Sequence, residues 1–246
     1  IMTKKINFVE NLISAKKKFG VVIFPGSNCD HDMIYVLEKI MNQEVVKLWH
    51  KDTDLQNCDF IVLPGGFSFG DYLRSGAIAR FSPIMEKVIE FANNGGYVLG
   101  ICNGFQILVE AKLLPGTLTA NKNHQFICKN TFIKPADSKS IVTNKLNKKD
   151  VFKIPIAHGE GRYYADHSII KQLQENNQIL FTYCDEQGNP TLESNPNGST
   201  LNIAGICNET KNVFGMMPHP ERAADPALGN IDGKIIFDAI IDSIKK

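Results

Sequence analysis

One cysteine in this sequence has the surroundings of a catalytic nucleophile. Cys102 stands in Gly-Ile-Cys-Asn-Gly (100–104), between an apolar run that predicts a buried strand (97–99) and a pattern that predicts a helix (105–114). A sharp strand-to-helix turn lifts the sulfur clear of the sheet and over a helix N-terminus, where the thiolate is favoured. Glycines on either side leave room for so tight a turn. The pentapeptide alone is equally compatible with a buried core cysteine.

A histidine and a glutamate near the C-terminus offer the base that a thiol nucleophile needs. His219 and Glu221 lie in Met-Pro-His-Pro-Glu-Arg (217–222), where the flanking prolines exclude a helix and predict an extended segment. Residues i and i+2 of an extended segment project to the same side. Glu221 can therefore orient one imidazole nitrogen while the other faces Cys102. The alternative is a solvated proline-rich turn with an incidental histidine.

Acyl transfer also requires hydrogen-bond donors for an oxyanion. Leu-Pro-Gly-Gly-Phe-Ser (63–68) ends a predicted strand, at the edge where parallel α/β sheets bind their ligands. The N–H that follows the nucleophile is the other expected donor. Gln106, one helical turn beyond Cys102, is expected to meet the substrate or support this loop, unless it is simply an exposed helix residue. The predicted oxyanion or substrate-binding residues are Gly65, Gly66, Phe67, Asn103 and Gln106.

Strands and helices alternate through the first half of the chain. Strands are predicted at 19–24, 45–49, 60–63 and 97–99, and helices at 30–41 and 77–91. The strands are almost continuously apolar, which is typical of a sheet covered on both faces. We therefore predict an α/β fold with a doubly wound, mostly parallel sheet flanked by helices.

The second half has a different pattern. Short strands are predicted at 126–128, 131–133, 154–156 and 179–181, a hairpin at 202–217, and a closing helix at 231–244. This predicts a smaller antiparallel or hairpin portion. Residues 1–18 are expected to form an N-terminal extension, and residues 19–246 a single domain that holds all of the motifs.

The composition limits the class of protein. The chain has 246 residues, 43% of them hydrophobic, and a formal net charge of +1, which gives no electrostatic reason to expect nucleic acid or an anionic membrane. The apolar runs fall short of the ~20 residues of a membrane span. The six cysteines include no Cys-x-x-Cys pair, so a metal site is not expected. Without a recognisable secretory signal, we expect reduced thiols and a cytoplasmic location.

Taken together, the motifs resemble a known enzyme class. Gly-x-Cys-x-Gly-x-Gln (100–106) with His-x-Glu (219–221) is similar to the triad-type (class I) glutamine amidotransferases. Three further stretches resemble the glutaminase subunits of phosphoribosylformylglycinamidine synthases within that class. They are Phe-Pro-Gly-Ser-Asn-Cys-Asp (24–30), Pro-Gly-Gly-Phe-Ser-Phe-Gly-Asp-Tyr-Leu-Arg (64–74) and Ala-His-Gly-Glu-Gly-Arg (157–162).

The resemblance implies a specific reaction. Cys102 would attack the side-chain amide of glutamine, His219 would transfer the protons, and Glu221 would hold His219, so that a glutamyl thioester forms and is hydrolysed to glutamate. The ammonia would pass to a large synthetase subunit, which converts formylglycinamide ribonucleotide to formylglycinamidine ribonucleotide in de novo purine biosynthesis. The resemblance also implies a small accessory subunit, ATP and Mg²⁺ on the synthetase, and no cofactor on this chain.

Two alternatives to this function stay open at this point. The chain could be another thiol hydrolase of the same fold, either a peptidase or a γ-glutamyl hydrolase. It could also be a non-enzymatic subunit that keeps the fold for assembly, although the complete triad argues against this. His158 and Arg162, in a glycine-rich stretch, fit either a shaped loop facing the synthetase or a structural turn with solvated charges.

Overall fold

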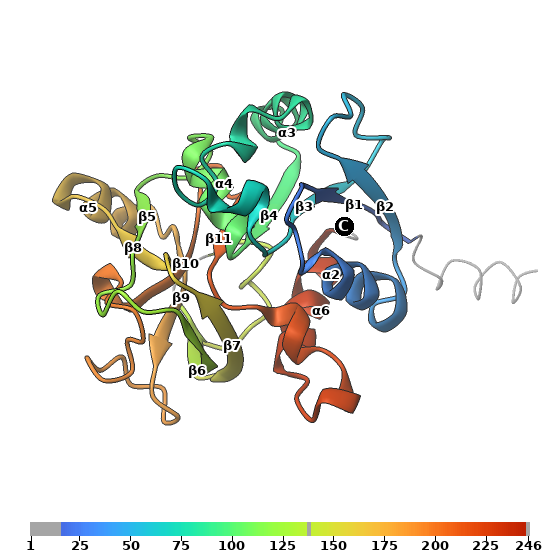
Figure 1. Ribbon diagram of the computed structural model, residues 1–246. Coiled ribbons are helices and arrows are strands. Elements are labelled where there is room, and N and C mark those ends of the chain that lie inside the picture. The colour runs from blue at the N-terminus through green and yellow to red at the C-terminus, as the bar shows by residue number, and fades with distance from the viewer. Residues whose placement is uncertain (1–15, 137–138, 245–246) are drawn as a thin grey trace, which may run out of the picture.

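The computed structural model describes residues 16–136 and 139–244, so residues 1–15 of the predicted N-terminal extension lie outside the described residues. The described chain is organised around a nine-stranded sheet with the order β2-β1-β3-β4-β11-β10-β9-β6-β7 (Figure 1). A separate two-stranded sheet pairs β5 (Thr117–Thr119) with β8 (Arg162–Tyr164). The predicted α/β fold class is confirmed.

One half of the large sheet is parallel. Its strands are β2 (Glu44–Trp49), β1 (Lys18–Ile23), β3 (Phe60–Leu63), β4 (Tyr97–Ile101) and β11 (Val213–Met216). The central strand β3, Phe-Ile-Val-Leu, is buried throughout because helices cover both faces. In Figure 1, α3 (Pro83–Asn93) and α4 (Asn103–Glu110) lie above these strands, and α2 (Asp30–Tyr35) and α6 (Asp232–Ile244) lie below.

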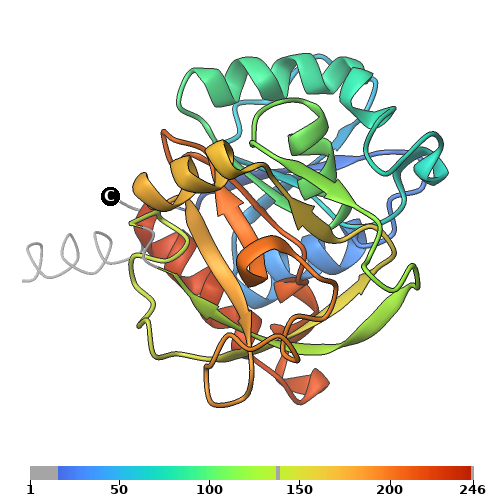
Figure 2. The same cartoon turned by 90° about the vertical axis from the view of Figure 1, so that its left-hand side faces the viewer.

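The other half of the sheet is antiparallel, and Figure 2 turns it toward the viewer. Its strands are β10 (Ile203–Cys207), β9 (Ile179–Cys184), β6 (Ile127–Pro135) and β7 (Phe152–His158), with α5 (His167–Glu175) following β8. β10 and β11 form the predicted hairpin. Each strand reverses direction relative to its neighbour, so β7 runs the same way as β11. β7 therefore ends, and β6 begins, at the edge where the parallel strands end.

Several elements differ from their predicted bounds, and for three of them the difference is instructive. The helix predicted at 77–91 begins at Pro83, because a residue before proline is held extended, here Ser82 at φ −64° and ψ 142°. The helix predicted at 30–41 continues from Val36 to Ile40 as a π-helical turn. The two short strands predicted at 126–133 form one strand, since pairing with β7 continues through the exposed polar residues between them.

The carboxyl ends of the parallel strands bring distant motifs together. The loop after β1 holds Cys29, the loop after β3 holds Gly65, the turn after β4 holds Cys102, and the segment after β11 holds His219. This is the sheet edge at which α/β proteins bind their ligands. In the described part of the chain, none of the helices is long and apolar enough to cross a membrane.

Candidate active site

The turn between β4 and α4 holds Cys102 in a backbone conformation that L-residues rarely adopt, φ 51° and ψ −106°. The neighbouring glycines make this turn possible. A Cβ on Gly104 would overlap the carbonyl oxygen of Leu63, and a Cβ on Gly100 would lie 2.6 Å from the Gly104 carbonyl group. The predicted strand-to-helix elbow is present, and the close packing of α4 against β4 explains Gly100, as that of α4 against β3 explains Gly104.

The side chain of Cys102 lies at the N-terminus of α4 and is nearly buried. The first N–H groups and the dipole of this helix point toward the space beside the sulfur and favour a negative charge there. The sulfur lies 3.7 Å from the carbonyl oxygen of Ala157 in β7. The antiparallel half of the sheet therefore contacts a nucleophile that the parallel half holds.

The structure brings His219 and Glu221 together as a buried pair. His219 Nδ1 lies 2.6 Å from Glu221 Oε1, and the two side chains are 2% and 0% exposed. The backbone N–H of His219 donates to the carbonyl oxygen of Pro155 in β7 (2.8 Å). The predicted extended segment is wrong in one respect: Pro220–Ala223 is a 3-10 turn. Proline suits the first position of such a turn. His219 stands directly before the turn and Glu221 is its second residue, and their side chains meet there.

The surroundings of His219 favour its protonated form. Burial alone would lower its pKa, but the Glu221 carboxylate and the thiols of Cys102 and Cys29 outweigh this and raise the pKa well above its usual value. His219 therefore holds a proton at neutral pH. Its Nε2 has no hydrogen-bond partner within the described structure, so this nitrogen is available to the nucleophile or to a substrate.

Gly65 packs against the imidazole ring of His219 and does not line the pocket beside Cys102. A Cβ at this position would lie 2.6 Å from Cε1 of His219 and 3.2 Å from the Cys29 sulfur. The carbonyl oxygen of Gly65 accepts from the Cys29 N–H (3.3 Å). Its missing side chain is what allows the imidazole ring to pack against this loop.

The next two residues of the loop face the pocket in different ways. Gly66 lines the pocket at φ 138°, a conformation that favours glycine. Within residues 16–136 and 139–244, the N–H groups of Gly66 and Asn103 have no acceptor. The N–H of Phe67 is occupied, because it donates to the Gly26 carbonyl oxygen (3.0 Å), and Phe67 is left to line the pocket with its ring. The geometry leaves Gly66 and Asn103 as the pair of available donors.

Two amide side chains connect the loop after β3, the helix α4 and the segment after β7. Asn103 Oδ1 accepts from the Ser68 N–H (3.1 Å), and Asn103 Nδ2 donates to Gln106 Oε1 (3.1 Å). Gln106 Nε2 donates in turn to the Glu160 carbonyl oxygen (2.7 Å). Both amides are buried, and Gln106 also lines the pocket. The side chain of Asn103 thus has a positioning role that its sequence position did not indicate.

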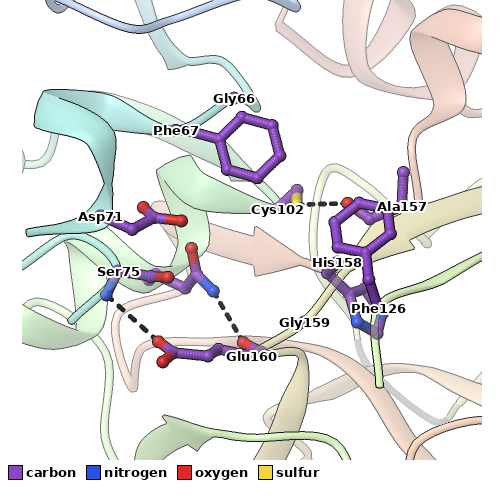
Figure 3. Close-up of a pocket in the computed structure, with 11 residues that line it drawn as sticks. Gly66, Phe67, Asp71, Ser75, Cys102, Phe126, Ala157, His158, Gly159 and Glu160 are labelled. Carbon is purple, nitrogen blue, oxygen red and sulfur yellow. Dashed lines mark hydrogen bonds between the residues drawn. The ribbon is translucent and has the colours of Figure 1, made fainter. Parts of the chain in front are cut away.

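A pocket of ≈ 170 Å³ opens beside Cys102. Figure 3 shows Asp71, Ser75 and Glu160 on one side of it and Ala157, His158 and Phe126 on the other. None of these six was predicted as a site residue. Asp71 and Glu160 did stand within the stretches that carry the family resemblance, which was the available signal. Asp71 and Glu160 lie close together because of the direction of β7, which cannot be predicted from the local sequence.

His158 is a buried, neutral member of the pocket wall. Asn121 Nδ2 donates to the carbonyl oxygens of Gln125 and His158, so Asn121 Oδ1 is the acceptor and His158 Nδ1 the donor across 3.0 Å. Burial, together with the charge on His219, lowers the pKa of His158 to about 4. Arg162 lies apart from the pocket lining, and its Nε donates to the Gly198 carbonyl oxygen.

One group of described side chains has donor atoms at metal-binding distances from one another. They belong to Cys29, His219 and Glu221, whose donor atoms lie within 4.8 Å of one another. His219 Nδ1 and Glu221 Oε1 are already 2.6 Å from each other, and the Arg222 guanidinium lies 3.2 Å from the Cys29 sulfur. The positive charge of Arg222 beside Cys29 is unfavourable for a cation bound by this group.

Comparison with known proteins identifies the family. The sequence model of the CobB/CobQ-like glutamine amidotransferase domain matches residues 16–234. This chain belongs to that family. The amidotransferase is 55% identical over 225 residues to the phosphoribosylformylglycinamidine synthase subunit PurQ of Chlorobium chlorochromatii (strain CaD3), covering 92% of this chain and 96% of that protein. It is also 55% identical to the PurQ subunit of Moorella thermoacetica, covering 92% and 95%.

A solved structure supports the same relationship. The amidotransferase matches a chain of the PurLQS structure from Thermotoga maritima with a TM-score of 0.80 and 39% sequence identity, covering 92% of this chain and 98% of that one. The resemblance that the motifs predicted, to glutamine amidotransferases and within them to the subunits of phosphoribosylformylglycinamidine synthase, is confirmed.

Proposed function

We propose that Cys102, His219 and Glu221 hydrolyse glutamine to glutamate and ammonia, and that the chain is the glutaminase subunit of a phosphoribosylformylglycinamidine synthase. The observation that carries this is an elbow cysteine at a pocket, beside a buried His219–Glu221 pair, in a chain that is 55% identical to PurQ subunits of that synthase. The roles of the individual residues follow from where they lie.

Formation of the thioester uses groups from three turns of the parallel half. Glutamine enters with its side-chain amide carbon against the Cys102 sulfur, and the thiolate attacks that carbon. The N–H groups of Gly66 and Asn103 receive the developing oxyanion. His219 gives its proton to the departing nitrogen, ammonia leaves, and the glutamyl thioester remains on Cys102.

Hydrolysis of the thioester restores the starting state. A water molecule attacks the thioester carbon while His219 accepts a proton from it. The carbon–sulfur bond breaks, glutamate leaves, and Cys102 is again a thiolate beside a protonated imidazole. Glu221 holds the imidazole in place through both steps and balances its charge when it is protonated.

The ammonia is used on another chain in this proposal. It passes to a large synthetase subunit, assisted by a small accessory subunit, which converts formylglycinamide ribonucleotide to its amidine. We place ATP and Mg²⁺ on the synthetase and no cofactor on this chain, because the glycine-containing stretch at 229–235 lacks the spacing of a P-loop. We also place the protein in the cytoplasm, where that ATP is available.

The domain division is part of the same proposal. We assign the glutaminase activity to the domain at 19–246, with residues 1–18 as an extension. The family match begins at residue 16 and β1 begins at Lys18, both close to the proposed boundary.

The test uses the chain reconstituted with its synthetase and accessory subunits. Cys102→Ala should abolish glutamine-dependent amidation while leaving ammonia-dependent amidation within about twofold of wild type. A glutamine-analogue electrophile should modify Cys102, as located by mass spectrometry. Unchanged glutamine-dependent amidation in Cys102→Ala would mean that the chain assembles with the synthetase without supplying its ammonia, and the proposal would be wrong.

A further inference from the structure

The pocket beside Cys102 is negatively charged on one side. Asp71 and Glu160 come from segments far apart in the sequence and lie together in its wall (Figure 3). The Ser75 N–H donates to Glu160 Oε2 (3.1 Å), and Asn103 Nδ2 lies 3.4 Å from Asp71 Oδ1. Among the described residues that line the pocket, none is lysine or arginine, and His158 is neutral. The two carboxylates therefore have no cationic partner within the pocket.

The charges around Asp71 would be better balanced with a cation in the pocket. Burial and the charge on Glu160 raise the pKa of Asp71, against a hydrogen bond with the Ser75 side chain that lowers it. The neighbouring guanidinium of Arg74 forms a bidentate pair with Glu110 at 2.8 and 2.7 Å, and it interacts electrostatically with Glu160 from outside the pocket lining. A positive group in the pocket would relieve the repulsion between the two carboxylates.

The neutral part of the wall also offers an acceptor. His158 is 2% exposed, and among residues 16–136 and 139–244 its Nε2 has no hydrogen-bond partner. Because Nδ1 donates to Asn121, Nε2 of the neutral ring carries a lone pair. Two carboxylates on one side of the pocket and an unpartnered ring nitrogen on the other suit a ligand group that only donates hydrogen bonds, which is the chemistry of an ammonium group.

We propose that Asp71 and Glu160 bind the α-ammonium group of the glutamine substrate. This rests on the proposed function, which places the side-chain amide of glutamine against Cys102. The cationic end of the substrate then reaches the acidic wall. The α-carboxylate finds no lysine or arginine in the described lining and is directed toward the pocket rim, where the rings of Phe67 and Phe126 pack with centroids 6.3 Å apart.

Such a subsite determines which amides the enzyme accepts. Free glutamine carries the ammonium charge, whereas a glutaminyl residue inside a peptide has an uncharged, acylated nitrogen. Two partly buried carboxylates side by side are less favourable without a cation than with one. The acidic wall therefore selects the free amino acid and works against peptide substrates.

The test compares glutamine with its desamino analogue, 5-amino-5-oxopentanoate, in the reconstituted complex. Wild type should prefer glutamine in kcat/KM by roughly 100-fold, as expected for loss of charge-assisted hydrogen bonds. Glu160→Gln and Asp71→Asn should each lower kcat/KM for glutamine by roughly 10-fold or more, mainly through KM, and leave the analogue within about twofold. Glu186→Gln, an equal charge change at an exposed residue outside the pocket lining, should alter neither.

A neutral alkylating agent separates binding from structural damage. Iodoacetamide should modify Cys102 at the wild-type rate in both variants, since it carries no charge. An unchanged preference for glutamine in both variants would overturn the subsite while leaving the glutaminase activity intact. An equal loss with both substrates and with iodoacetamide would make the residue structural and would also overturn its binding role. Failure of wild type to hydrolyse glutamine would refute the proposed function itself.

Discussion

The two halves of the large sheet contribute different things to the site. The parallel half holds the groups assigned to the reaction: Cys102 after β4, Gly66 after β3 and His219 after β11. The antiparallel half surrounds them with backbone carbonyl groups from β7 and with the pocket wall that includes Glu160. Reactive groups lie at turns whose glycine or proline requirements are local, whereas the surrounding wall is assembled by strand pairing over long distances.

The largest expected effect tests whether chemistry belongs to the parallel half. Glu221→Gln removes the charge that holds and balances the His219 imidazole, so kcat for glutamine should fall by roughly 10³- to 10⁴-fold with little change in KM. Steady-state ammonia release in the complex measures this. Glu209→Gln, at an exposed glutamate in the β10–β11 hairpin, is the matched control and should be neutral. A loss confined to KM would assign Glu221 to substrate binding instead.

The second prediction concerns stability in the antiparallel half. His158 has a pKa of about 4 in the folded protein against an ordinary 6.5, so the unfolded chain binds the proton first as pH falls. Stability is therefore unaffected above about pH 6.5 and decreases toward pH 4, by about 3 kcal/mol in total. His219, with its raised pKa, stays protonated across this window and does not produce the slope.

Urea unfolding at a series of pH values measures this effect. The free energy of unfolding of His158→Gln should depend less on pH between 4 and 6.5 than that of wild type, by most of those about 3 kcal/mol. The other titratable groups are the same in wild type and His158→Gln, so their contributions cancel in the difference between the two proteins. If the free energies of unfolding of the two proteins changed equally with pH, His158 would titrate in the folded chain as it does in the unfolded chain. The assignment of His158 as a neutral residue would then be wrong.

The smallest expected effect comes from a substitution beside His219 that should lower activity without a large change in stability. Gly65→Ala places a Cβ 2.6 Å from Cε1 of His219, so the imidazole must shift, and kcat should fall by roughly 10²-fold. The obstacle is a side-chain ring, so thermal unfolding should change by only a few degrees. Full activity in Gly65→Ala would show that His219 has more freedom than its buried hydrogen bond to Glu221 indicates.

Most of the parallel half could be predicted from local sequence. The apolar runs locate β1, β3 and β4, and the glycines at 100 and 104 mark the elbow because a side chain there would strike β3 or α4. The pairing of His219 with Glu221 also followed from their spacing, even though the segment between them is a helical turn. Local sequence did not predict that the Phe67 N–H donates to the Gly26 carbonyl oxygen and is therefore not free to bind a substrate.

The antiparallel half was less accessible. β6 was predicted as two pieces because exposed polar residues interrupt its apolar pattern, yet backbone pairing with β7 continues through them. The acidic wall was missed for a related reason. Asp71 and Glu160 meet only because a series of strand reversals brings the end of β7 to the same edge as the end of β3. Such long-range register has no signal in a single sequence.

The backbone of Cys102, at φ 51° and ψ −106°, has a consequence for how this chain can evolve. Glycine adopts such a conformation without the steric cost of a Cβ, which is of order 1–3 kcal/mol for other residues. Selection for a sturdier fold alone would therefore replace this cysteine with glycine. Keeping the nucleophile is a standing compromise between stability and activity, and a descendant freed from glutamine chemistry should be able to gain stability at position 102.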